Sequence, residues 1–231
     1  MKSVSEKDLS MPLKPKEEAF VTRLLKWQRK CGRAFPWRKT RDLYIVLVTE
    51  QLLRKTTAHQ VNAIFKQFFS RFERAQDLAA APASQIRDLI YPLGMEHERA
   101  RVLKRFGKAL SSATRPPRTR TELLELPGIG EYAADAALCM VYGEDAPMVD
   151  RNVVRLVKRV FSLKTPRPQR REARAVRNFV AKIIPKNRGR EFNLAMLDFA
   201  ALVCKARNPE CANCIENDIC DYYRKTKFPI K

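Results

Sequence analysis

Leu126-Pro127-Gly128-Ile129-Gly130 separates two helical patterns, Thr121–Leu126 and Glu131–Val141, and this stretch organises the chain around it. Its two glycines allow positive φ and carry no side chain, so backbone N–H groups can approach a ligand closely. Those amides lie at the start of the second helix, where the helix dipole favours an anion. The candidate contacts to such an anion are Leu126, Gly128, Ile129 and Gly130. An ordinary tight turn between helices is the structural alternative.

The composition of the chain favours a polyanionic partner. Its 231 residues include 46 Lys and Arg against 25 Asp and Glu, a formal net charge of +21. Such an excess predicts nucleic-acid binding that weakens steeply with salt, although a ribosomal-type protein or a binder of anionic membranes would share it. No apolar run is long enough to span a bilayer and no secretory signal opens the chain, so we expect an intracellular protein.

Helical periodicity dominates the rest of the sequence. Apolar residues recur at helical spacing from Glu17 onward, and the run from Leu43 to Leu53 favours helix over a buried strand because the pattern continues to Phe69. Pro and Gly separate the segments, and no alternating strand pairs stand out. We therefore predict an all-α fold. The further helices are expected at residues 84–91, 97–112, 131–142, 151–161, 170–184 and 191–203.

Four cysteines near the C-terminus have the spacing C-x6-C-x2-C-x5-C and include no histidine. Thiolates are soft ligands, so the candidates are tetrahedral zinc and an iron–sulfur cube. Zinc ribbons usually pair two C-x2-C hooks, whereas this run has a single one, which favours the cube. The predicted ligands are Cys204, Cys211, Cys214 and Cys220.

Two carboxylates are candidates for catalysis. Glu50 falls on the apolar stripe of its predicted helix, where burial would raise its pKa toward values useful for proton transfer. A carboxylate at the edge of the stripe, reaching water or pairing with Arg54, is the alternative. Asp150 precedes the helix that starts at Arg151. It suits an N-cap, and an aspartate fixed there stays ionised and can stabilise a cationic transition state.

Several motifs together resemble the helix-hairpin-helix DNA glycosylases with an iron–sulfur cluster, the endonuclease III superfamily. The resemblance covers nearly the whole chain, from about Lys16 to Tyr223. It implies that the hairpin grips backbone phosphate, that the four cysteines hold a 4Fe–4S cluster, and that Asp150 helps to cut the N-glycosidic bond of a flipped-out nucleotide. The motifs that carry it are 36–38 (PWR), 49–53 (TEQLL), 126–130 (LPGIG), 149–153 (VDRNV) and the cysteine run.

The resemblance also implies a two-lobed architecture. A six-helix barrel is expected over residues 35–145, with the hairpin at about 121–141. An iron–sulfur cluster lobe is expected from residues 16–34 and 146–224. Residues 1–15 mix Lys, Ser and Pro and are expected to form a basic, flexible arm.

Within this superfamily, the details of the chain favour one branch. Bifunctional lyases carry a lysine nucleophile early in the second hairpin helix, where this chain has Tyr132, so a monofunctional enzyme is implied. Simple packing is the alternative role for Tyr132. Adenine glycosylases of the MutY type typically have a Gln-Gln pair where Arg54-Lys55 stands, and they carry an extra C-terminal domain. The stretch FPWRKTRD at 35–42 looks closest to the thymine/uracil mismatch glycosylases of the Mig type.

Three residues are expected near the gap that an extruded base leaves. Arg54 and Lys55 suit the N7 and O6 acceptors of an orphaned guanine, although phosphate contacts or a solvated charge pair would use the same residues. Met95, in the loop Leu93–His97, resembles the apolar wedge that enters the base stack, and a packing role is its alternative.

The predicted protein is thus a monomeric DNA glycosylase that acts on mismatched thymine or uracil opposite guanine in double-stranded DNA. Glu50, Tyr132 and Asp150 would form its catalytic set. An adenine glycosylase without the inspection domain is the first rival, and a non-catalytic DNA-binding protein on the same scaffold is the second.

Overall fold

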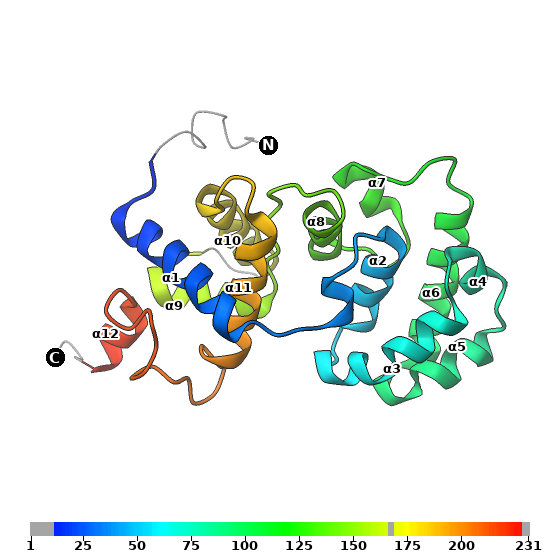
Figure 1. The fold of residues 1–231 in the computed structure, drawn as a ribbon, viewed down its shortest axis with the longest axis horizontal. Helices are drawn as coiled ribbons and strands as arrows, with labels where there is room; N and C mark the ends of the chain where they lie inside the picture. The colour runs from blue at the N-terminus through cyan, green and yellow to red at the C-terminus, as the bar shows by residue number, and fades with distance from the viewer. Residues whose placement is uncertain (1–11, 166–168, 228–231) are drawn as a thin grey trace. The chain divides into compact units, whose positions relative to one another are not determined.

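The computed structural model describes residues 12–165 and 169–227, and every regular element in these ranges is a helix (Figure 1). The predicted all-α class is confirmed. The described chain divides into two compact units, which we call unit 1 (residues 1–33 and 145–231) and unit 2 (residues 34–144). The predicted boundaries of the two lobes stay predictions, and so does the iron–sulfur cluster expected in one of them. The expected flexible arm lies outside the described residues except for its last four positions.

Unit 2 is built from short helices around an apolar centre. Helices α4 and α5 pack against α6, while α2 and α7 pack against α8. Its large, fully buried side chains include Leu47, Leu52, Phe68, Ile86 and Phe106. The helices are α2 (Leu43–Leu52), α3 (Ala58–Arg71), α4 (Ala75–Ala80), α5 (Ala83–Ile90), α6 (Glu96–Ser111), α7 (Arg120–Glu125) and α8 (Glu131–Met140), with short 3-10 turns η2 (Pro36–Arg38) and η3 (Tyr91–Leu93).

Local sequence signals explain where α2 and α3 begin. The Asp42 carboxylate accepts a hydrogen bond from the backbone N–H of Ile45, at 2.9 Å, and so caps α2. Thr57 and Gln60 form a reciprocal capping box at the start of α3. The strand-like centre of α2, residues 45–48, forms a helix because three of its four side chains are buried and find apolar neighbours around the helix.

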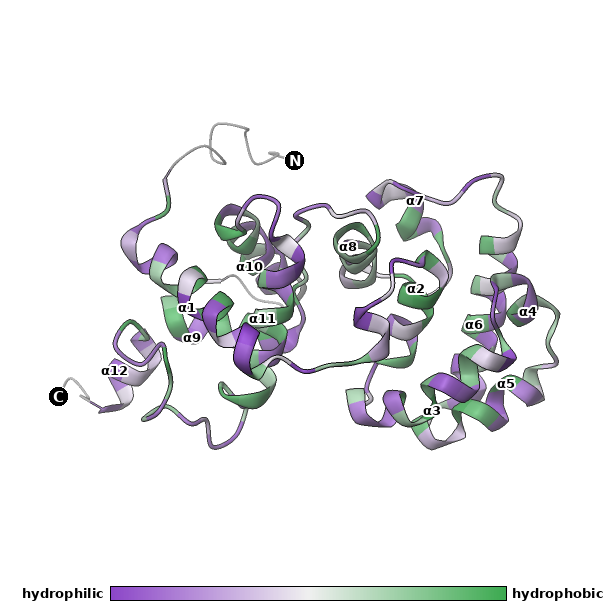
Figure 2. Cartoon of the chain, viewed as in Figure 1, coloured by the Kyte–Doolittle hydropathy of each residue, from purple (hydrophilic) through white to green (hydrophobic). Residues whose placement is uncertain are grey.

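Unit 1 combines the N-terminal helix with the C-terminal part of the chain. Helix α1 packs against α11, and α9 packs against α10, α11 and α12. Phe20, Leu156, Phe192 and Phe199 are buried at the centre, and Figure 2 shows green, apolar residues on the helix faces alternating with purple, polar ones. The helices are α1 (Pro15–Cys31), α9 (Arg151–Phe161), α10 (Gln169–Ile183), α11 (Gly189–Leu202) and α12 (Asp221–Lys227).

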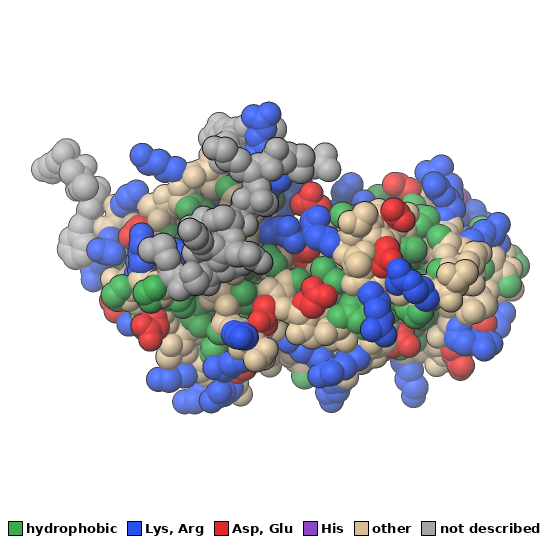
Figure 3. Space-filling view, turned by 90° about the horizontal axis from the view of Figure 1, so that it is seen from above, with side chains coloured by type: hydrophobic (Ala, Val, Ile, Leu, Met, Phe, Trp, Pro, Cys, Tyr) green, Lys and Arg blue, Asp and Glu red, His purple; other side chains and the backbone are tan. Residues whose placement is uncertain are grey.

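The six later helices predicted from the sequence are confirmed, with ends that differ by at most two residues. The helix predicted at residues 151–161 is observed with the same ends as α9. The helix predicted at 131–142 is observed as α8, which ends at Met140. None of the helices in the described ranges is both long and apolar enough to cross a membrane. Lys and Arg side chains are spread widely over the face drawn in Figure 3, with acidic side chains among them.

Candidate functional site

The hairpin between α7 and α8 exposes its glycines and buries its apolar residues. Leu126 and Ile129 are buried, while Gly128 and Gly130 are exposed. The backbone N–H of Ile129 donates to the Leu126 carbonyl at 3.1 Å, which closes the turn. Two apolar side chains therefore anchor the loop, and its backbone is left at the surface at the N-terminus of α8. This geometry suits the phosphate contact predicted for the four hairpin residues.

Gly128 is required by its surroundings as well as by its backbone angle. Its φ is +81°, in the left-handed region that favours glycine. A Cβ added there would lie 2.5 Å from Val102 Cγ1 and 2.6 Å from Gln51 Oε1. The hairpin thus lies directly against α2 and α6 of the same unit.

Arg54, Lys55 and Met95 line one cleft in unit 2, so the structure brings the three predicted gap residues together. The cleft opens to solvent. Lys55 and Met95 are both non-glycine residues with φ of 56°. Such left-handed backbone is uncommon outside glycine and marks conformations that neighbouring contacts must hold.

Glu50 lies in the last turn of α2 between two buried polar residues. Its own side chain is half-buried, and its catalytic role stays a prediction. The hydroxyl of Thr49 and both amide atoms of Gln51 are buried and have no hydrogen-bond partner among the described residues. Three consecutive polar residues thus interrupt an otherwise apolar helix, a combination that costs free energy and is typical of functional sites.

The other two catalytic candidates begin helices. Tyr132 is half-buried in the first turn of α8 in unit 2. Asp150 belongs to unit 1 and caps α9, since one carboxylate oxygen accepts the backbone N–H groups of Asn152 and Val153, both at 2.8 Å. Its other oxygen accepts the Asn152 side-chain amide at 2.8 Å. The predicted N-cap role is observed, and both carboxylate oxygens are held in place. The catalytic grouping of Asp150 with Glu50 and Tyr132 stays a prediction.

The four predicted cysteine ligands line one largely apolar pocket in unit 1. Burial raises the pKa of the Cys214 thiol to about 12 and also raises the pKa values of Cys211 and Cys220. Arg159 donates to Cys204 Sγ at 3.5 Å. Within the described ranges, no three Cys, His, Asp or Glu side chains lie close enough together to hold a single metal ion. The thiols therefore surround a common space without converging on one point.

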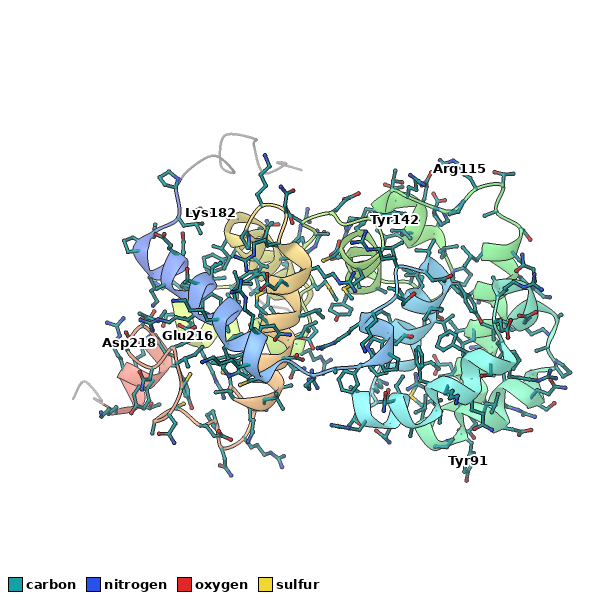
Figure 4. The ribbon with its side chains drawn as sticks, viewed as in Figure 1. Tyr91, Arg115, Tyr142, Lys182, Glu216 and Asp218 are labelled. Atoms are coloured by element: carbon teal, nitrogen blue, oxygen red, sulfur yellow. The ribbon has the colours of Figure 1, made fainter. Side chains whose placement is uncertain are left out.

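The last loop before α12 is tied to α1 by a charged pair. Arg23 donates to both oxygens of Asp218, at 2.5 and 3.0 Å. Figure 4 shows Asp218 and Glu216 beside one another on this loop. The buried Glu216 side chain lies 3.9 Å from Arg23, and burial raises its pKa to about 8. The Asp218 contacts hold the loop that follows Cys214.

Comparison with known proteins places these features in a family. Residues 48–181 match the HhH-GPD superfamily of base excision DNA repair proteins. This chain belongs to that superfamily.

Relatives in the superfamily cover nearly the whole chain. The thymine/uracil-DNA glycosylase of Methanothermobacter thermautotrophicus is 36% identical, covering 91% of this chain and 96% of its own. The thymine-DNA glycosylase of Aeropyrum pernix is 39% identical, covering 89% and 95%. The solved structure of a thermostable thymine-DNA glycosylase superposes with a TM-score of 0.83 at 35% identity, covering 91% of this chain and 97% of that one. The predicted recognition of the superfamily is confirmed.

Two residues of unit 1 hold the predicted site residues in place and were not predicted from the sequence of this HhH-GPD chain. The side-chain oxygen of Asn152 accepts from Arg155 at 2.9 Å. Arg155 also donates to the carbonyls of Cys204 and Ala200, at 3.0 and 2.8 Å. A chain of hydrogen bonds thus runs from the Asp150 carboxylate to the backbone of the first cysteine. Asn152 lies in the motif 149–153 and Arg155 follows it in α9, but only tertiary contacts reveal the chain of hydrogen bonds.

Arg99 is the corresponding residue missed in unit 2. It is 8% exposed and lies on the buried stripe of α6 with Leu103 and Phe106. An arginine at i, followed by apolar residues at i+4 and i+7, is a charged residue in a core position, and this pattern could have drawn attention to it.

Proposed function

We propose that this protein is a monofunctional DNA glycosylase that hydrolyses the N-glycosidic bond of thymine or uracil mismatched with guanine. The observation that carries the proposal is the similarity of nearly the whole chain to two thymine-acting glycosylases, at 36% and 39% identity. We further propose that the chain acts as an intracellular monomer on double-stranded DNA. Its net charge of +21 suits a polyanionic substrate.

Asp150 is the proposed electrostatic centre of the reaction. Cleavage of the bond between deoxyribose and base develops positive charge on the sugar, and a fixed anion stabilises that charge. Three N–H donors hold the Asp150 carboxylate at the N-terminus of α9, where the helix dipole favours an anion. It would also take the proton of the attacking water.

Glu50 and Tyr132 complete the proposed catalytic set. The half-buried Glu50 would orient the attacking water or, in its protonated form, donate a hydrogen bond to the leaving base. Tyr132 would line the base pocket. Because a phenol cannot form the Schiff base that a lysine forms, its presence supports hydrolysis without a lyase step at this position.

The cleft in unit 2 is the proposed site for the gap in the DNA. Arg54 and Lys55 at its edge carry donors that suit guanine N7 and O6, and Met95 is 43% exposed there as the apolar wedge. The exposed backbone of Gly128 and Gly130 would bind a phosphate of the same duplex. Recognition of the guanine and binding of the phosphate would thus both come from loops of unit 2.

The four cysteines are the proposed ligands of a 4Fe–4S cluster. Four thiols around one cavity that do not converge on a single point fit a cluster with separate iron corners better than one tetrahedral ion. When bound, the cluster would supply a rigid scaffold for the loop of Lys205 and Arg207, which would face DNA phosphates. Iron and sulfide analysis of anaerobically purified protein tests this assignment, and stoichiometric zinc without iron would contradict it.

A panel of duplexes tests the proposed reaction. We expect base release from T/G and U/G pairs and none of comparable rate from A/G, A/8-oxoguanine or thymine-glycol sites. The strand should break only after alkali, because no lysine-based lyase step is proposed. Release of adenine alone would replace the proposal with an adenine glycosylase. Binding to every duplex without base release would favour the non-catalytic alternative.

A further inference from the structure

Arg99 joins two loops of unit 2 that carry proposed DNA contacts. Its guanidinium donates to the Gln51 and Leu52 carbonyls at 2.8 and 3.3 Å, to the Arg54 carbonyl, and, through Nε, to the Gly94 carbonyl at 2.9 Å. We propose that Arg99 is a positioning residue that holds Arg54, Lys55 and Met95 in the geometry that recognises the gap left by an extruded base. This inference rests on the function proposed above.

The four acceptors explain why an arginine occupies this position. The carbonyls of Gln51 and Leu52 lie at the C-terminal end of α2, where a helix leaves its last carbonyls without partners and where a cation is favoured. Lysine offers donors from a single point, whereas the planar guanidinium presents five N–H groups in fixed directions. The forked guanidinium reaches the end of α2 and the loop before α6 together.

The remaining two carbonyls occupy equivalent places in their loops. The Arg54 carbonyl directly precedes Lys55, and the Gly94 carbonyl directly precedes Met95. Lys55 and Met95 are the two lining residues of the cleft with left-handed backbone, each with φ of 56°. In both loops, Arg99 therefore holds the peptide group that directly precedes the residue with left-handed backbone. Strain of this kind persists only where surrounding contacts determine it.

The hairpin is connected to the same arginine through Gln51. Arg99 binds the main-chain carbonyl of Gln51, while the buried side chain of Gln51 lies against Gly128 in the hairpin. Burial, and then the nearby charge of Arg54, lower the pKa of Arg99 below its ordinary value. Arg99 is thus a desolvated cation that these backbone carbonyls and the nearby charge of Glu98 stabilise.

The first test is Arg99→Lys, with Arg101→Lys as the matched control because Arg101 is exposed on the same helix. The readout is the ratio of affinities for two duplexes, one with a tetrahydrofuran abasic analogue opposite guanine and one fully paired. We expect Arg99→Lys to reduce this ratio about tenfold. The variant loses charge-assisted hydrogen bonds to the two loops, which should weaken binding to the gap and leave binding to the paired duplex unchanged. The control should keep the wild-type ratio. A wild-type ratio in a folded Arg99→Lys protein would overturn the proposal.

A second variant keeps the proposal testable if Arg99→Lys fails to fold. Gly94→Ala changes an exposed position with φ of 70° and nothing within 4 Å of an added Cβ, so it disturbs the loop without touching the core. If Arg99 couples the two loops, hydrogen–deuterium exchange should accelerate at residues 54–56 as well as at 94–96. Faster exchange confined to 94–96 would overturn the coupling.

These measurements separate the present inference from the proposed function. If wild-type protein releases no base from U/G duplexes, the proposed function fails, while the exchange experiment still decides whether Arg99 couples the loops. If wild type is active and Arg99→Lys changes only melting temperature, Arg99 is merely structural. A lowered gap preference with unchanged affinity for paired duplex supports the positioning role, because general destabilisation would not discriminate between the two duplexes.

Discussion

Asp150 and Glu122 are both carboxylates that accept backbone N–H groups at the start of a helix, yet their surroundings give them different roles. Asp150 also receives the side chain of Asn152, which Arg155 holds in turn. Glu122 forms a capping box with Thr119 and pairs with the exposed Arg115. The first carboxylate is fixed by a network that extends into the fold, and the second belongs to a local cap on α7.

Asp150→Asn should separate catalysis from folding. Asparagine is as good an N-cap as aspartate, so we expect the free energy of unfolding to change by less than about 1 kcal/mol. Loss of the fixed anion should slow base release by about 10²–10³-fold. Single-turnover assays on a U/G duplex and chemical denaturation measure the two effects. Asp145→Asn is the matched control, since Asp145 accepts the N–H groups of Asn187 and Gly189 around the start of α11 in the same unit. An undiminished rate in Asp150→Asn would contradict the catalytic role.

Glu122 should contribute a pH-dependent part of the stability. Backbone N–H groups of Thr119 and Arg118 lower its pKa from 4.5 to about 2. A depressed carboxylate pKa stabilises the folded state above the unfolded value, and this stabilisation is lost as pH falls through the folded value. We therefore expect wild type to lose stability from about pH 4.5 to about pH 2, and Glu122→Gln to lose less over this interval.

Urea denaturation at several pH values measures this difference. Glu125→Gln is the matched control, because it removes one carboxylate from α7 outside the capping box. Equal flattening of the pH dependence by both variants would show that the cap is not its source.

At the scale of elements, the hairpin and α2 determine the geometry of the loops that we propose contact DNA. The LPGIG stretch predicted a turn with accessible amides, and the observed burial of Leu126 and Ile129 adds that the side chains anchor it. The contact between Gly128 and Gln51 could not be predicted, since the two residues are far apart in the sequence. Helix periodicity located α2, but burial of its polar residues depends on the neighbours that pack around it.

Gly128→Ala should damage the hairpin more than Gly130→Ala. At Gly128 a Cβ meets Val102 and Gln51 and the backbone is left-handed, so we expect a loss of about 2 kcal/mol or more in the free energy of unfolding. Gly130 has φ of −106° and no atom within 4 Å of an added Cβ. Thermal melts and duplex affinity compare the variants. Equal losses at both positions would contradict the steric explanation.

At the scale of the whole molecule, the net charge predicts how affinity for DNA depends on salt. A net charge of +21 spread over the chain favours contacts with several phosphates at once. We expect affinity for undamaged duplex to fall by about 10³-fold between about 50 and about 200 mM salt. Fluorescence anisotropy titrations measure the slope. A nearly salt-independent affinity would show that the charge is not used for DNA.

Composition and helical periodicity by themselves determined the all-α class and most helix boundaries, and the sequence motifs carried the resemblance to the superfamily. These features are local, because a cap such as Asp150 or a turn such as Gly128 acts within a few residues of chain. Tertiary structure alone decided that Arg54, Lys55 and Met95 share a cleft, that Arg99 holds their loops, and that Asp150 connects through Arg155 to the cysteine segment. Such contacts join residues distant in sequence, and they form only when packing excludes water and leaves buried polar groups to find each other.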